Sequence, residues 1–137
     1  MRWDRFTVMS QEAFQAAQSK AEELGHQQLM PEHLLWALLT QEGNIVPEVL
    51  AKVGVNADRL SQETGQALER LPKVQGAGEV FLSPALRQVM DGARQEAEKL
   101  KDEYISTEHL LLAMLKDRSS EGGRLLEKRF RAGGIQD

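Results

Sequence analysis

The chain has 137 residues and a formal net charge of −4, and it contains no cysteine. This length fits one domain, and the lack of cysteine excludes disulfides, thiolate metal sites and a cysteine nucleophile. Leu, Glu, Ala and Gln far outnumber the β-branched residues, which excludes an all-β fold. The sequence also has no long basic run and no apolar run of membrane length, so it does not favour nucleic acid or lipid as a partner.

The first predicted helix runs from about residue 8 to 24. Thr7 is its expected N-cap, and Gly25 is expected to end it. Pro31 then opens a short helix that is too apolar for the surface and is expected in the core. A third helix is predicted over 46–53, and Asn56 is expected to cap a fourth over 57–70.

The next stretch, 71–82, contains prolines and glycines and is predicted to be a linker. Ser83 then resembles Thr7 as an N-cap, and a helix is predicted over 84–101. Ser106 is expected to cap a second short apolar helix, and a further helix is predicted over 121–130. Residues 131–137 are short and rich in glycine, so they are predicted to be a tail.

These elements form an internal repeat with an offset of 76 residues. Segments 21–39 and 97–115 are identical at nine of 19 positions, and Thr7 and Ser83 have the same spacing. Such self-similarity indicates a duplicated structural unit. The predicted fold is all-α: one domain with a pseudo-twofold, duplicated four-helix repeat, the first copy over about 1–70 and the second over about 83–130, truncated near its end.

The sequence has no phosphate-binding loop, no dinucleotide-binding glycine motif and no His-Glu-x-x-His zinc motif. Its three histidines are His26, His33 and His109. The last two occupy equivalent places in the repeats beside leucines, so we interpret them as hydrogen-bonding core residues rather than metal ligands. No catalytic residue, metal or cofactor is predicted. A small metal enzyme is the weakest alternative, because only carboxylates would complete its ligand set.

Glu32 and Glu108 lie in the first turns of the two short helices, where the helix dipole favours a carboxylate without any function. The functional hypothesis pairs Thr7 with Glu32 and Ser83 with Glu108, as two symmetry-related sites that grip cationic side chains of another polypeptide. Both interpretations stay open at the level of sequence.

Aromatic residues are few and are expected mainly in the core. Trp3, Phe6 and Phe81 flank the starts of the two units, and from there they could line an apolar surface groove.

Four segments carry a family resemblance: 4–7, 32–35, the linker 70–76 and 101–109. Together they resemble the double N-terminal domain of the Clp/AAA+ chaperones, and the Leu-Pro-Lys-Val-x-Gly linker is most similar to that of the ClpB-type disaggregases. The resemblance covers about residues 1–130.

The resemblance implies an all-helical domain that engages unfolded or aggregated protein and passes it to AAA+ modules of the same polypeptide. ATP and magnesium would belong to those modules, which are absent here. By the same resemblance the isolated domain is expected to be a cytoplasmic monomer, and its parent a homohexamer. Adaptor binding, as in ClpA and ClpC relatives, is the alternative function.

The resemblance also implies site residues. Positions matching Thr7, Asp102 and Glu108 are implicated in substrate engagement in ClpB relatives. Positions matching Thr7, Glu32, Ser83 and Glu108 resemble a phosphoarginine site in ClpC-like relatives.

Two features depart from the family pattern. Three leucine positions of the family's apolar groove fall on Gly92, Glu96 and His109. From Phe130 onward, the chain also differs from the eighth helix and flexible linker that the family would continue with.

Overall fold

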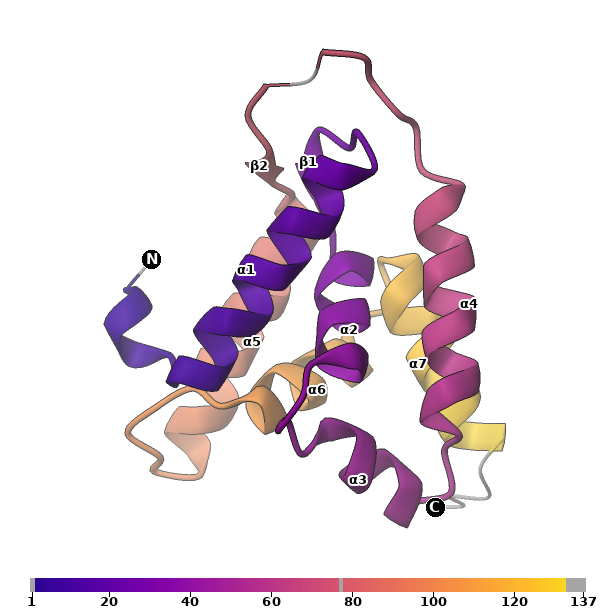
Figure 1. The fold of residues 1–137 in the computed structure, drawn as a ribbon. Coiled ribbons are helices and arrows are strands. Elements are labelled where there is room, and N and C mark those ends of the chain that lie inside the picture. Colours follow the sequence, from indigo (N-terminus) through magenta and orange to yellow (C-terminus); the bar gives the residue numbers. More distant parts are fainter. Residues whose placement is uncertain (1, 77, 133–137) are drawn as a thin grey trace.

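The computed structural model describes residues 2–76 and 78–132, and within them the chain forms seven α-helices and two very short strands (Figure 1). A 3₁₀ turn, η1, spans Trp3–Arg5. The elements that follow are α1 (Val8–Glu23), β1 (Gln28–Leu29), α2 (Pro31–Thr40), α3 (Val46–Lys52), α4 (Ala57–Glu69), β2 (Phe81–Leu82), α5 (Pro84–Lys99), α6 (Thr107–Lys116) and α7 (Glu121–Ala132). The all-α prediction is confirmed, and the five helices predicted with both bounds begin and end within two residues of them.

The expected caps begin the long helices. The side-chain oxygens of Thr7, Asn56 and Ser83 each accept a hydrogen bond from the backbone N–H three residues later, at 3.1 Å. Such bonds satisfy amides that have no partner within the helix. The ends of α1 and α5 also correspond: Gly25 has φ +74°, and its equivalent Lys101 has φ 59°. The second repeat therefore keeps the same left-handed turn without glycine.

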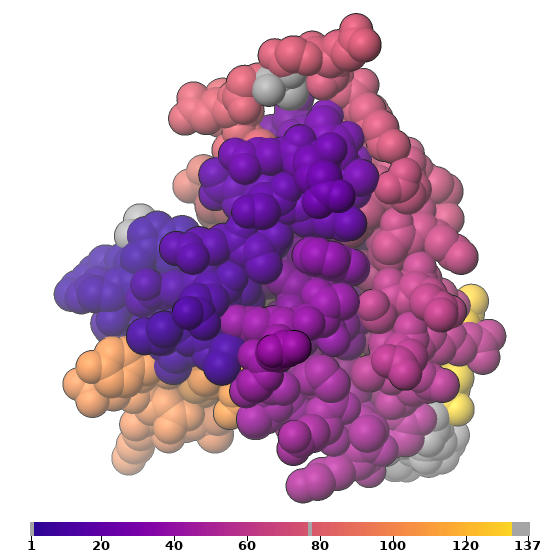
Figure 2. All heavy atoms as spheres, in the orientation of Figure 1, coloured from indigo at the N-terminus to yellow at the C-terminus, as the bar shows by residue number. Residues whose placement is uncertain are grey.

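Backbone pairing joins the two repeats at the starts of their helices, and each segment pairs with one from the other repeat. Leu29 pairs with Leu82 in the parallel β1–β2 ladder, and Phe6 forms the symmetry-equivalent parallel bridge with Ile105. Each pair joins the segment before the long helix of one repeat to the segment before the short helix of the other. Figure 2 shows the N-terminal segment, in indigo, lying against the orange segment between α5 and α6.

The sequence did not predict this pairing. In particular, β2 lies inside the segment that was predicted as a linker, so the connection after α4 ends in an ordered strand.

The short helices α2 and α6 form the centre of the core. Leu34, Leu35 and Leu38 of α2 are completely buried, as are Leu110 and Met114 of α6. The long helices α1 and α5 pack against α2 and α6 respectively, which makes each repeat a helical hairpin. The prediction that these helices are too apolar for the surface is confirmed.

The helices α4 and α7 lie side by side against α2 (Figure 1). The Arg129 guanidinium of α7 forms a bidentate pair with the Glu63 carboxylate of α4, with both N–O distances 2.7 Å. α7 includes residues 131 and 132 of the predicted tail, and 133–137 lie outside the described residues. Within the described residues, the second repeat contains no counterpart of α4.

We expect Leu35→Ala and Leu111→Ala each to lower the free energy of unfolding by about 2–5 kcal/mol, because both side chains are buried and their truncation leaves a cavity. Leu112→Ala is the matched control: this leucine is 38% exposed on α6, and its truncation should cost less than about 1 kcal/mol. Urea denaturation measures all three. An unchanged midpoint in either core variant would contradict this packing.

Candidate functional site

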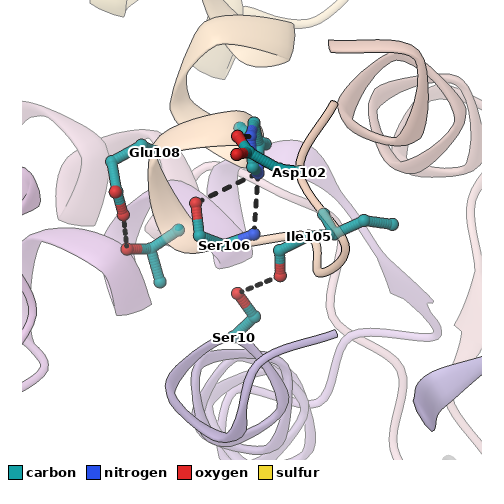
Figure 3. Close-up of polar contacts among 7 residues, drawn as sticks. Ser10, Asp102, Ile105, Ser106 and Glu108 are labelled. Atoms are coloured by element: carbon teal, nitrogen blue, oxygen red, sulfur yellow. Dashed lines mark hydrogen bonds and ion pairs between the residues drawn. The ribbon is translucent and has the colours of Figure 1, made fainter. Parts of the chain in front are cut away.

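The start of α6 is built from both repeats (Figure 3). The backbone N–H of Thr7 donates to the carbonyl of Ile105 at 3.0 Å, and the Ser10 hydroxyl donates to the same oxygen at 3.0 Å. Thr7 also caps α1 through Ser10. The N-cap of the first repeat is thereby fixed beside the first turn of the short helix of the second.

A histidine orients one carboxylate at this end. The Ser106 N–H donates to Nδ1 of His109 at 2.9 Å, so the proton of the neutral ring lies on Nε2, which is 2.8 Å from Oδ2 of Asp102. The ring is buried, whereas the Asp102 side chain is 49% exposed. Asp102 is therefore held in one place while it faces solvent.

The second carboxylate, Glu108, lies in the first turn of α6 next to His109. Glu108 is exposed, and its Oε1 accepts a hydrogen bond from the Thr107 hydroxyl at 3.1 Å. The loop just before α6 also exposes apolar side chains: Leu100 is 59% exposed and Tyr104 is 49% exposed. We call the exposed side chains of Leu100, Asp102, Tyr104 and Glu108, together with Thr7, the open end.

The start of α2 has the same framework but is covered. The Ser83 N–H donates to the Leu29 carbonyl at 3.1 Å, as Thr7 does to Ile105. Glu32, the equivalent of Glu108, is only 2% exposed, because the start of α7 packs on it. Its Oε1 accepts from the Gly122 N–H at 3.2 Å, and a Cβ on Gly122 would come within 3.2 Å of the same oxygen.

Burial of Glu32 raises the pKa of its carboxyl group, because removal from water disfavours the charged form; the Gly122 N–H opposes this shift. Glu32 thus contacts another helix of its own chain rather than solvent. We call the Glu32, Ser83 and Gly122 region the sealed end.

Two sequence-based expectations about these residues are wrong. Thr7 lies beside the start of α6 and Ser83 beside the start of α2, so the pairing of Thr7 with Glu32 and of Ser83 with Glu108 is exchanged. The physical reason is that α1 and α2 form a hairpin, and α1 is about 24 Å long, which places its two ends far apart. The two ends are also unequal, since only one glutamate faces solvent.

A hollow of about 530 Å³, lined by both apolar and polar side chains, lies between α1 and α5. Its floor includes Phe14 of α1 and Met90 of α5, which are equivalent residues of the two repeats, and Trp3 forms one wall. Glutamines 11, 15 and 18 and Arg87 supply the polar lining. Equivalent residues of the two repeats therefore line the hollow, which could accept apolar side chains of another polypeptide.

The three aromatic candidates behave differently. Trp3 is 44% exposed and lines the hollow, whereas Phe81 is 60% exposed on β2 and is not among the residues that line it. The expectation for Phe6 is wrong: it is only 2% exposed, because its ring packs against those of Trp3 and Phe14, with centroids 5.2 and 5.6 Å away. The backbone bridge between Phe6 and Ile105 holds the Phe6 side chain toward the core.

The surface between α5 and α6 is polar. Gly92 and Glu96 line a second hollow of about 470 Å³ together with Lys99 and Lys116. The Glu96 carboxylate accepts a hydrogen bond from Lys116, which lowers the pKa of that carboxyl group. His109 is buried and faces Asp102 instead. The three non-leucine positions therefore leave no apolar groove here.

His33 and His109 are hydrogen-bonded core residues, as predicted, and His26 is buried beside His33. His33 Nδ1 accepts from the Met30 N–H at 2.9 Å, and its Nε2 lies 2.8 Å from His26 Nδ1. Among the described residues, no group of three or more His, Asp or Glu side chains could hold a metal ion.

Sequence and structure comparisons agree with this architecture. A family model described as the Clp repeat N-terminal domain matches residues 5–129. The chain belongs to this family. It is 38% identical over 130 residues to the chaperone protein ClpB of Rhodopseudomonas palustris and 41% identical over 128 residues to that of Vibrio cholerae, covering 93% of this chain in each case. The chain spans about 15% of the length of these relatives.

Solved N-terminal domains share the fold. The Hsp104 N-terminal domain of Candida albicans superposes with a TM-score of 0.79 at 22% identity, over 96% of this chain and 83% of that one. The ClpV N-domain of Vibrio cholerae gives a TM-score of 0.78 at 21% identity, over 93% and 78%. The matched region is a helical N-terminal domain of Clp chaperones and not an ATPase module.

The described helices are also too short or too polar to span a membrane.

The sealed end gives a direct prediction. Glu32→Gln should keep or raise the free energy of unfolding at pH 7 by up to about 1 kcal/mol, because the amide oxygen still accepts from Gly122 but carries no buried charge. Glu32→Ala should lower it by about 1–3 kcal/mol, since it leaves the Gly122 N–H unpaired.

The pH dependence follows from the raised pKa. The buried charge costs stability as the pH rises through the pKa of Glu32, so the difference between wild type and Glu32→Gln should shrink as the pH falls toward the ordinary value of 4.5. Urea denaturation at several pH values measures this. A glutamine variant less stable than wild type by more than about 1 kcal/mol at pH 7 would contradict the role of Glu32 as a buried packing residue.

Proposed function

We propose that this chain is the part of a ClpB-like disaggregase that first binds unfolded or aggregated polypeptide. The binding is non-catalytic and needs no cofactor. The rest of the parent protein, a hexamer in the cytoplasm, supplies the ATP- and magnesium-dependent motor to which the client passes. Family membership and the similarity to ClpB chaperones support this assignment.

The observation that carries the proposal is the composition of the open end. Two solvent-facing carboxylates, Asp102 and Glu108, lie around one helix start near the exposed side chains of Leu100 and Tyr104. An unfolded client offers apolar side chains together with cationic ones, and this surface complements both. Because His109 fixes Asp102 in advance, less side-chain entropy is lost when a cationic group binds.

The hollow between α1 and α5 extends the same surface. η1, which carries Trp3, leads directly into Phe6 and Thr7 at the open end, so a client segment can contact both places. The apolar floor would take up apolar side chains, and the glutamines would hydrogen-bond the client backbone. Binding should be weak, since one small surface gains little burial after the cost of association.

A phosphoarginine site at each helix start receives less support. Such a pair of sites needs both glutamates accessible, and Glu32 is covered by α7. A folded adaptor is the other alternative, and it would require a larger continuous surface than the open end.

The test is client binding by a Glu108→Gln variant. We expect the affinity for a fluorescent, unfolded peptide that contains apolar and lysine residues to fall several-fold, because the amide loses the charge-assisted bond, while the unfolding midpoint stays the same. Affinity should also fall between 0.05 and about 0.3 M salt in wild type and less so in the variant.

Glu103→Gln is the matched control, since Glu103 is an exposed carboxylate in the same loop and should have little effect. Equal affinity in wild type and Glu108→Gln at both salt concentrations would refute the carboxylate role. Selective binding of one folded protein, with no binding of the unfolded peptide, would favour the adaptor alternative.

A further inference from the structure

The first repeat contains a buried histidine pair that the second repeat lacks. His26 is 2% exposed and His33 is fully buried, and the two ring nitrogens that face each other are 2.8 Å apart. In the second repeat the position of His26 is taken by Asp102, which is exposed. The same framework therefore holds two different hydrogen-bonded pairs.

Hydrogen bonding fixes the protons of the histidine pair. Nδ1 of His33 accepts from the Met30 N–H, so the ring proton lies on Nε2 and is donated to Nδ1 of His26. The proton of His26 must then lie on its own Nε2, which is buried, has no hydrogen-bond partner and faces the backbone of Leu68 at the end of α4. In the neutral pair, every ring nitrogen except Nε2 of His26 therefore has a hydrogen-bond partner.

The neutral histidine pair holds two ring protons, and a third proton cannot be added without breaking a hydrogen bond. It would lie either on Nδ1 of His26, against the N–H of His33, or on Nδ1 of His33, against the N–H of Met30. Each position puts two donors head to head in a buried site. In the second repeat, an extra proton on Nδ1 of His109 would likewise meet the Ser106 N–H at 2.9 Å, but there the Asp102 carboxylate, 2.8 Å from Nε2, would balance the charge.

The segment after α4 covers the His26 side of the histidine pair. The Val74 N–H donates to the Gly25 carbonyl at 2.8 Å, and Leu71, Pro72 and Val74 enclose a hollow of about 290 Å³ with His26 and Met30. Figure 2 shows this connection, in rose, arching over the end of α1. Its removal would expose apolar side chains from both sides of the hollow.

The charged groups around His26 do not favour its protonation. Lys73 and Glu69 are the charged side chains that act on it, and they form an ion pair with each other at 3.0 Å. Glu32, the sequence neighbour of His33, is directed to Gly122 of α7. Burial lowers the pKa of both rings, that of His33 to about 4, and the charge of the other histidine adds to this for His33.

We propose that the His26–His33 pair is an acid-sensitive latch: protonation of the pair releases segment 70–76 from the first repeat and uncovers the apolar side chains beneath it, while the second repeat stays closed. The latch adds a conditional apolar surface, distinct from the open end, to the client-binding domain.

The direction of the pH effect follows from linkage. Because both rings bind a proton more weakly in the closed form than in the open form, the closed form keeps its full stability above about pH 6.5 and loses it as the pH falls toward 4. Uptake of one proton changes the opening equilibrium by about tenfold for each pH unit in this window.

Amide hydrogen exchange at pH 7 and pH 5, corrected for intrinsic exchange rates, tests the proposal on the full chain. The Val74 N–H should lose protection by about tenfold or more at pH 5. The Asp102 N–H, which donates to Ala97 at 2.8 Å in the second repeat, should keep its protection and serves as the internal reference.

His26→Asn should reduce the pH dependence at Val74, because its amide oxygen still accepts from His33 but only the His33 ring is left to take up a proton. His109→Gln is the control and should leave the response of Val74 intact. Equal protection of Val74 at both pH values in wild type, or the same loss in a folded His26→Asn protein, would overturn the proposal.

If His26→Asn does not fold, NMR titration of the wild-type histidine rings decides. Ring titration of His26 and His33 below pH 6, accompanied by shifts of the Val74 amide, supports the latch. Ring titration near pH 6.5 without such shifts refutes it. Neither result depends on client binding, so failure of the latch and failure of the proposed function are distinguishable.

Discussion

The structure depends on the exchange of backbone pairs between the two repeats. The Thr7 N–H donates to the Ile105 carbonyl and the Ser83 N–H to the Leu29 carbonyl, so each long helix begins beside the segment that leads into the short helix of the other repeat. At the start of each long helix, the backbone hydrogen-bond partner therefore comes from the other repeat. The apolar faces of α2 and α6 then share one core, which makes the duplicated chain a single domain rather than two.

The same exchange creates two equivalent ends, and a few side chains make them different. At the start of α2, α7 covers Glu32 and the connection after α4 covers His26, so this end is closed by the chain itself. At the start of α6, the equivalent residues Glu108 and Asp102 face solvent. Duplication supplies the same frame twice, and only the copy at the start of α6 leaves its carboxylates exposed to solvent.

Local features of the fold could be predicted from the sequence, whereas contacts between distant segments could not. Thr7, Ser83 and Asn56 were correctly predicted as N-caps because capping depends on the next three residues. The burial of Glu32 depends on Gly122, 90 residues away, and that of Phe6 on its bridge to Ile105. The equal offset of Thr7 and Ser83 contained a signal for the symmetry, but not for the exchange of partners.

Chemical-shift mapping tests most directly the claim that only one of the two equivalent ends binds clients. Titration of the labelled chain with a reduced, alkylated unfolded protein should shift the backbone amides of Thr7, Asp102 and Glu108, together with those lining the hollow between α1 and α5. The amides of Glu32 and Gly122 should stay unchanged at pH 7. Equal shifts at both helix starts, or shifts confined to the start of α2, would contradict the account.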